Sequence, residues 1–85
     1  MKWRLAWTQR AIREAERLDP AVRQRIVVAL DRYAEDEHGD VVRLAATDPP
    51  EWRLRVGAWR VRFQRDPDSK TLHILRVLPR GKAYR

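Results

Sequence analysis

The amino-acid sequence predicts a small α+β fold, in which an N-terminal strand and a helical hairpin pack on a small antiparallel-rich sheet. Two observations predict it. Apolar residues recur at helical spacing in the first half of the chain and at every second position in most of the second half. Turn residues divide these segments into the order β-α-α-β-β-β-β. At 85 residues the chain has room for one core, so we expect a single domain spanning residues 1–85.

The first three elements are a strand and two helices. Trp and Leu alternate with Lys, Arg and Ala over residues 2–7, as in a strand with one buried face. Thr8 follows as a candidate N-cap of a helix. Asp19-Pro20 ends that helix and begins a second one, because Pro suits the first helical turn. We expect the second helix to close at Gly39, and the short link between the two predicts an antiparallel hairpin.

Four strands complete the order. A short strand is predicted over residues 41–44, and alternating apolar residues predict two more over 52–56 and 59–63. Gly57-Ala58 between these two supplies a two-residue turn, with Gly at the position that a type II′ hairpin favours. The last strand, residues 71–78, is mostly apolar, which is typical of a central strand.

The hairpin over residues 52–63 separates apolar from cationic side chains. Its apolar set is Trp52, Leu54, Val56, Trp59, Val61 and Phe63. Its cationic set is Arg53, Arg55, Arg60 and Arg62. Because successive side chains of a strand point to opposite faces, we expect the apolar set to pack on the helices and the arginines to share one exposed surface. Such a surface suits an anion; the alternative is a solvated face that is merely rich in Arg.

The distribution of charge supports an anionic partner. The formal net charge is +7, and it lies wholly in residues 51–85, which hold ten basic and three acidic side chains. Sixteen of the 19 cations are Arg, whose planar fork matches phosphate and carboxylate groups better than Lys does. With a sequence pI near 11, this composition predicts a polyanionic partner.

Several functional classes are excluded. Without Cys the chain has no disulfide, no Cys-ligated zinc and no thiol catalysis, which fits a reducing cytoplasm. No apolar stretch approaches the roughly 20 residues that cross a bilayer, so we expect no membrane partner. The acidic residues and His38 between positions 36 and 40 lack a metal-ligand spacing and are interpreted as a solvated loop. No metal or other cofactor is expected.

The C-terminal tail adds Arg80, Lys82 and Tyr84 directly after the last strand. A tail in this place can curl over the sheet, and clustered positive charge would favour the phenolate form of the tyrosine. Arg is effectively always protonated, which makes it a poor base but a good stabiliser of a negatively charged transition state. Tyr84 is therefore the best candidate base; the alternative is a terminal ring that packs on the sheet edge.

Three segments together resemble a RelE/ParE-superfamily toxin of a bacterial toxin–antitoxin pair. They are residues 3–18, the hairpin 52–63, and the ending 77–84. The resemblance implies a RelE-like fold with a helical hairpin on a four-stranded antiparallel-rich sheet. It also implies metal-independent cleavage of mRNA, in many members within the ribosomal A site. The 2′-hydroxyl would attack the neighbouring phosphate and leave a 2′,3′-cyclic phosphate.

The resemblance also implies roles for individual residues. Tyr84 matches the catalytic general base, Arg80 the residue that supports the leaving group, and Arg60 the residue that stabilises the phosphate. Arg53 and Arg55 fall where the family places basic residues that contact RNA.

Three further residues of the hairpin and the C-terminal segment carry expectations. Arg62 and Lys82 join the RNA-binding residues because of their places in the hairpin and the tail. Pro79 departs from the polar or basic residue that many relatives carry before the Arg, which leaves Arg80 and Tyr84 to manage proton transfer or lowers activity.

The expected partners are a cognate antitoxin, whose acidic or amphipathic segment wraps the toxin in a heteromeric complex, and mRNA on the ribosome. Two alternatives stay open at this point. One is a ParE-like inhibitor of DNA gyrase without nuclease activity, and the other is a basic nucleic-acid-binding module without catalysis.

Overall fold

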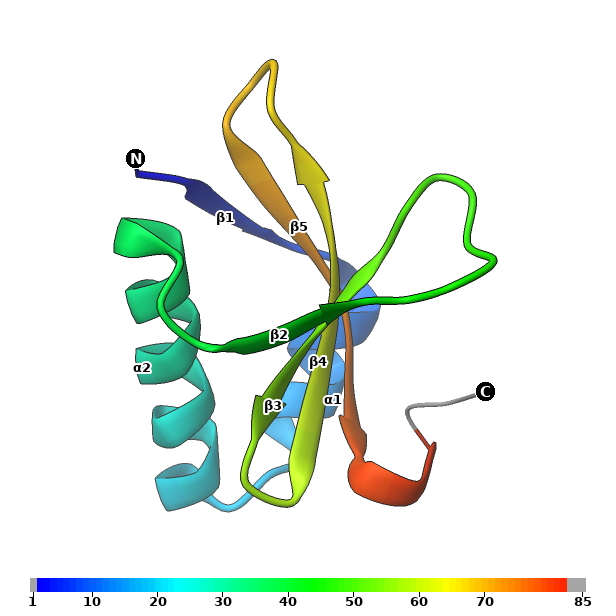
Figure 1. The fold of residues 1–85 in the computed structure, drawn as a ribbon. Helices are drawn as coiled ribbons and strands as arrows, with labels where there is room; N and C mark the ends of the chain where they lie inside the picture. The colour runs from blue at the N-terminus through cyan, green and yellow to red at the C-terminus, as the bar shows by residue number, and fades with distance from the viewer. Residues whose placement is uncertain (1, 83–85) are drawn as a thin grey trace.

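The computed structural model describes residues 2–82, which form two α-helices and five strands (Figure 1). In chain order the elements are β1 (Arg4–Trp7), α1 (Gln9–Glu16), α2 (Pro20–Asp36), β2 (Asp40–Arg43), β3 (Trp52–Val56), β4 (Trp59–Asp66), β5 (Thr71–Pro79) and the short 3₁₀ helix η1 (Arg80–Lys82). The predicted α+β class and the predicted order of elements are confirmed.

The strands form one mixed sheet in the order β1-β5-β4-β3-β2. β1 pairs in parallel with β5, and the other three pairings are antiparallel. The resemblance implied four strands; the described residues have five, with β1 as an edge strand beside β5. The first and last of these strands therefore lie side by side (Figure 1), and β5 is an interior strand flanked by β1 and β4, whereas β4 holds the middle position.

The helix boundaries follow from local capping. The Thr8 hydroxyl accepts a hydrogen bond from the backbone N–H of Ala11 at 3.1 Å, as an N-cap does. Pro20 occupies the first turn of α2, as predicted. α2 ends at Asp36, earlier than the expected closure at Gly39, because Glu37 adopts a left-handed conformation with φ of 60° and bonds back to the carbonyl of Tyr33.

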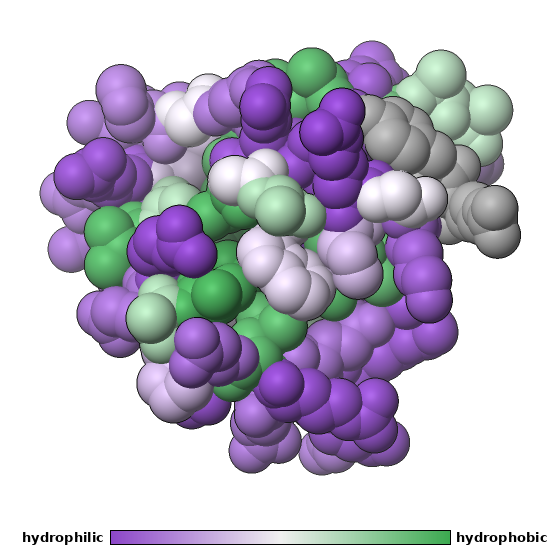
Figure 2. Space-filling model, turned by 90° about the horizontal axis from the view of Figure 1, so that it is seen from below, coloured by the Kyte–Doolittle hydropathy of each residue, from purple (hydrophilic) through white to green (hydrophobic). Residues whose placement is uncertain are grey.

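The core lies between the helices and one face of the sheet. Its fully buried members from the hairpin are Leu54, Val61 and Phe63, which confirms the predicted apolar face. They pack with Ile26 and Leu30 of α2, and both helices contribute to this one cluster. The opposite face of the hairpin is thus left for the arginines. Figure 2 views the end of the molecule that carries the β3–β4 turn, where hydrophilic side chains surround a central apolar area.

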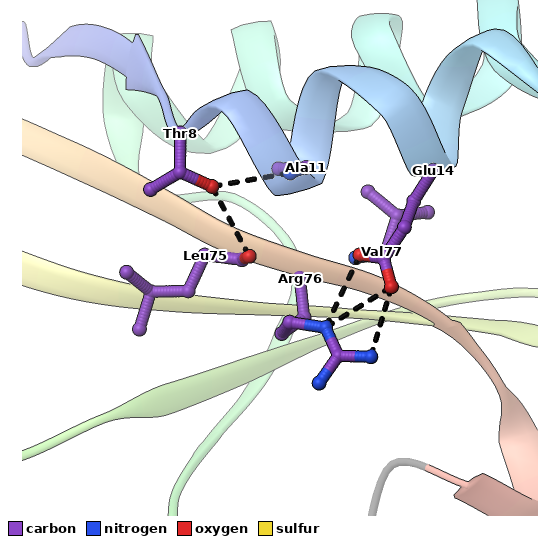
Figure 3. Close-up of polar contacts among 6 residues, drawn as sticks. All are labelled: Thr8, Ala11, Glu14, Leu75, Arg76 and Val77. Atoms are coloured by element: carbon purple, nitrogen blue, oxygen red, sulfur yellow. Dashed lines mark hydrogen bonds and ion pairs between the residues drawn. The ribbon is translucent and has the colours of Figure 1, made fainter.

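A β-bulge interrupts the pairing of β4 with β5. Arg62 is opposite Arg76 and Phe63 is opposite Ile74, so Leu75 has no partner on β4. Helix α1 satisfies backbone groups at this irregularity (Figure 3). The Thr8 hydroxyl, at the start of α1, donates to the Leu75 carbonyl. The Glu14 carboxylate accepts from the backbone N–H of Val77. The bulge is therefore held from the helix side.

Gly39 offers a test of the packing between the α2–β2 link and the sheet. A Cβ atom at this position would lie 2.9 Å from Cδ1 of Leu54, which is itself buried. We expect Gly39→Ala to lower the free energy of unfolding by about 1–3 kcal/mol, because Ala is strained at the φ of 156° that Gly39 adopts and because Leu54 must shift within a packed core. Urea denaturation measures the change. The matched control is Gly81→Ala, where a Cβ meets open space; equal losses in the two variants would contradict the packing argument.

Candidate nucleic-acid interface

Strand register brings the predicted arginines together in opposed pairs. Arg53 is directly opposite Arg62, and Arg55 is directly opposite Arg60. Arg76 of β5 is opposite Arg62 on its other side, so three arginines form a row across β3, β4 and β5. Arg76 had no predicted role. The β-bulge that places it opposite Arg62 cannot be recognised from the alternation of apolar and polar residues.

Arg60 differs from its prediction. It was expected on an exposed surface, but the residue is only 5% exposed. Its Nη1 donates to the carbonyl of Gly57 at 2.8 Å and to the carbonyl of Trp59 at 2.9 Å. The guanidinium folds back over the two-residue turn because the turn leaves carbonyl groups that need donors. Gly57 has φ of 58°, the left-handed value that this turn requires of its first residue.

Arg80 is attached to the same turn. Its backbone N–H donates to the carbonyl of Ala58 at 2.9 Å. The carbonyls of residues 57–59 therefore accept hydrogen bonds from Arg60 and Arg80. The two predicted residues thus lie close together at this turn. Arg80 and Lys82 are exposed in η1. Tyr84, the predicted base, lies outside the described residues.

A small polar cavity adjoins Arg60 on the open face of the sheet. Its volume is about 140 Å³, and its lining is Asp40, Val42, Arg53, Arg55 and Arg60. One carboxylate oxygen of Asp40 lies 4.0 Å from Arg55, whose side chain is 62% exposed. At that distance and exposure the ion pair stabilises the fold little. Three cations and one carboxylate thus surround a cavity suited to an anion.

Arg62 is paired and mostly covered, contrary to the expected exposed surface. Its Nη2 lies 2.6 Å from Oε1 of Glu51, and the two side chains are 16% and 18% exposed. Arg76 makes a similar pair with Glu14 of α1, at 2.9 Å (Figure 3). The hairpin itself carries no acidic residue over 52–63, yet Asp40 of β2 and Glu51 of the preceding loop reach two of its arginines, and Glu14 of α1 reaches Arg76 on the neighbouring β5. Their contribution could not be read from the hairpin alone.

Arg65 lies on the other face of β4, where it is partly buried against the edge of the core. Its guanidinium carbon is 4.9 Å from the ring centroid of Trp3 and 5.3 Å from that of Trp52. It also donates to the hydroxyl of Tyr33 and to Glu37, each at 3.2 Å. Burial raises the pKa of Tyr33 above its ordinary value, against the opposing effect of the Arg65 charge. Arg65 therefore covers the edge of the core and has no place in the interface.

The part of the chain that the structure describes shows neither a metal-binding cluster nor a membrane-spanning helix. Across residues 2–82, no group of three or more His, Asp or Glu side chains is placed to hold a metal ion. His38 donates its backbone N–H to the Asp36 carboxylate at 3.0 Å in the exposed link after α2. No helix in the described part of the chain is long and apolar enough to cross a membrane.

Comparison with known proteins identifies relatives. A family model described as the ParE toxin of type II toxin–antitoxin system, parDE, matches residues 5–84. A search of curated proteins found no match.

Several solved structures share the fold. A chain of the archaeal RelE–RelB complex from Pyrococcus horikoshii is 26% identical, with a TM-score of 0.80 over 98% of this chain and 100% of that one. A chain of the Mycobacterium tuberculosis toxin–antitoxin complex RelBE2 is 24% identical, with a TM-score of 0.73 over 94% and 100%. A mutant of the E. coli toxin RelE in the free state is 18% identical, with a TM-score of 0.68 over 98% and 87%.

The burial of Arg60 gives a testable difference between two arginines of the cavity. We expect Arg60→Ala to lower the free energy of unfolding by about 1–3 kcal/mol, because two carbonyls of the turn lose their donor. Arg55→Ala removes the same charge from an exposed site and should change it by less than about 0.5 kcal/mol. Thermal and urea unfolding of both variants measure the difference. If Arg60→Ala were as stable as the unaltered protein, the guanidinium would not be needed to hold the turn.

Proposed function

This chain belongs to the ParE toxin family of type II toxin–antitoxin systems, and from its arginine-lined cavity and its similarity to RelE we propose that it cuts mRNA and so inhibits translation. The proposed unit is one toxin domain over residues 1–85, acting in the cytoplasm on mRNA held by the ribosome. An antitoxin is its partner, as RelB is for RelE in the similar complexes. The reaction is metal-independent attack of a ribose 2′-hydroxyl on the adjacent phosphate.

One observation carries the proposal: Arg60 and Arg80 hold the same turn beside an arginine-lined cavity. The three carbonyls of residues 57–59 accept from these two residues, and Arg53 and Arg55 line the cavity with Arg60. RNA presents a phosphodiester and ribose hydroxyls, which guanidinium groups recognise through forked hydrogen bonds. A rigid turn is a suitable support for such groups, because catalysis depends on donors that are positioned in advance.

Each proposed residue has a distinct chemical role. Nη1 of Arg60 serves the turn, and its Nε and Nη2 hydrogens can stabilise charge on the phosphate oxygens. Tyr84 takes the proton from the 2′-hydroxyl, whose oxygen then forms a bond to phosphorus. The bond from phosphorus to the 5′-oxygen breaks, Arg80 stabilises the charge on that oxygen, and water supplies its proton. The products are a 2′,3′-cyclic phosphate and a 5′-hydroxyl.

The remaining cations bind the RNA strand and take no part in the reaction. Arg53, Arg55, Arg62 and Lys82 contact phosphates of the bound strand. Backbone contacts of this kind release counterions, so binding should weaken steeply as salt is raised. The assignments of Arg62 and Lys82 rest on strand alternation and on the position of η1 directly after β5.

The role of Tyr84 is directly testable. We expect Tyr84→Phe to lower the rate of mRNA cleavage by about 100- to 10,000-fold, because only the phenolic oxygen, which accepts the proton as phenolate, is removed. Toxin induction followed by primer extension on a translated mRNA measures the loss, and fragments that map to in-frame codons would establish ribosome dependence. Circular dichroism and thermal unfolding should match the unaltered protein. Full toxicity of Tyr84→Phe would reject the assignment.

A second candidate function is inhibition of DNA gyrase, and the match to a ParE family model favours it. The two functions differ in their target. A gyrase inhibitor would block supercoiling by purified gyrase and leave a translated mRNA whole, whereas the proposed nuclease would do the reverse.

A further inference from the structure

We propose that Glu51 is a positioning residue of the RNA interface, where it fixes Arg62 for phosphate contact. The inference rests on the proposed function and adds to it a carboxylate that contacts the arginine-bearing face of the sheet. Glu51 directly precedes β3, and Arg62 lies in β4 opposite Arg53.

The contact between Glu51 and Arg62 is close and directional. A single oxygen, Oε1 of Glu51, accepts from Nε of Arg62 at 3.0 Å and from Nη2 at 2.6 Å. Both side chains are less than one-fifth exposed, so water screens the pair much less than it screens the exposed pair of Asp40 and Arg55. Two hydrogen bonds to one side of a planar guanidinium also set its orientation.

Glu51 is itself held by the loop that delivers it. Its backbone N–H donates to the hydroxyl of Thr47 at 2.9 Å, and its carbonyl accepts from the backbone N–H of Leu44 at 2.9 Å. The Thr47 hydroxyl also donates to the Leu44 carbonyl, at 3.4 Å. These bonds close the 44–51 loop on itself, so the carboxylate starts from an anchored backbone.

The arginine row explains why Arg62 requires such an anchor. Arg62 sits between Arg53 on β3 and Arg76 on β5, and like charges directly opposite one another repel. Glu14 holds Arg76 from α1, and Glu51 holds Arg62 from the loop. Without Glu51, the Arg62 guanidinium would move away from its neighbours and out of register with a bound phosphate.

A purely electrostatic role for Glu51 makes the opposite prediction. If the carboxylate only reduced the positive charge of the interface, its removal would tighten RNA binding and would not slow cleavage. If it positions Arg62, its removal slows cleavage although the net charge becomes more positive. The sign of the change in cleavage rate therefore separates the two roles.

The test compares Glu51→Ala and Glu51→Gln with Asp48→Asn, which removes one negative charge from an exposed site in the same loop. Cleavage of mRNA in a reconstituted translation reaction gives kcat and KM. Fluorescence anisotropy gives binding to a short RNA whose scissile 2′-hydroxyl is replaced by hydrogen. We expect Glu51→Ala to lower kcat by about 10- to 100-fold, as a misplaced binding group does. Glu51→Gln should lose less, because it retains an acceptor oxygen, and Asp48→Asn should stay within about twofold.

A double-mutant cycle adds a readout that general loss of stability would not produce. Arg62→Ala should lower kcat as much as Glu51→Ala does, and the double variant should lose little more than either single variant. If thermal unfolding shows that Glu51→Ala does not fold, Glu51→Gln replaces it in the cycle.

Three outcomes would overturn the inference. Faster cleavage and tighter binding by the Glu51 variants would assign Glu51 a charge effect only. Effects equal to those of Asp48→Asn, or fully additive losses in the cycle, would also reject a positioning role, while the proposed nuclease function would stand. Unaltered protein that neither binds nor cuts RNA would overturn the proposed function itself.

Discussion

The structure depends on one constraint: the apolar face of the β3–β4 hairpin must be buried, and this places arginines opposite arginines on the other face. Leu54, Val61 and Phe63 set the register through their burial, and a shift by one residue would send them to solvent. Like charges on adjacent strands are the cost of that register. Carboxylates from the 44–51 loop, from β2 and from α1 offset it, and Arg60 is drawn onto the turn.

Periodic features of the fold could be predicted from the sequence, whereas the partners of individual side chains could not. Strand alternation, the Thr8 cap and the Gly57-Ala58 turn are local properties, and the structure has all of them where they were expected. The pairing of Glu14 with Arg76 joins positions 62 residues apart, and no local pattern marks it. The same holds for the burial of Arg60, since alternation assigns a face to a residue but not the path of a long side chain.

Arg65 illustrates how identical residue types acquire different functions within one strand. Arg60 and Arg62 lie on the open face, whereas Arg65 lies beyond the bulge on the core side, between two indole rings. A guanidinium is suited to this place because it stacks on aromatic faces and still donates at its edge. Counting cations along the strand would therefore overstate the charge that the interface presents.

The parallel pairing of β1 with β5 has a consequence for synthesis of the toxin. The Thr8 hydroxyl reaches the Leu75 carbonyl across 67 positions, and β1 has its pairing partner only in the last strand. Contacts between residues so distant in sequence form slowly, because closing the long loop between them costs chain entropy. A nascent chain on the ribosome can complete this sheet only after β5 has emerged, and Arg80 follows β5 directly. Completion of the sheet and assembly of the arginines around the β3–β4 turn therefore both wait for β5 and for Arg80, so a nascent chain that has not yet exposed them lacks that arrangement.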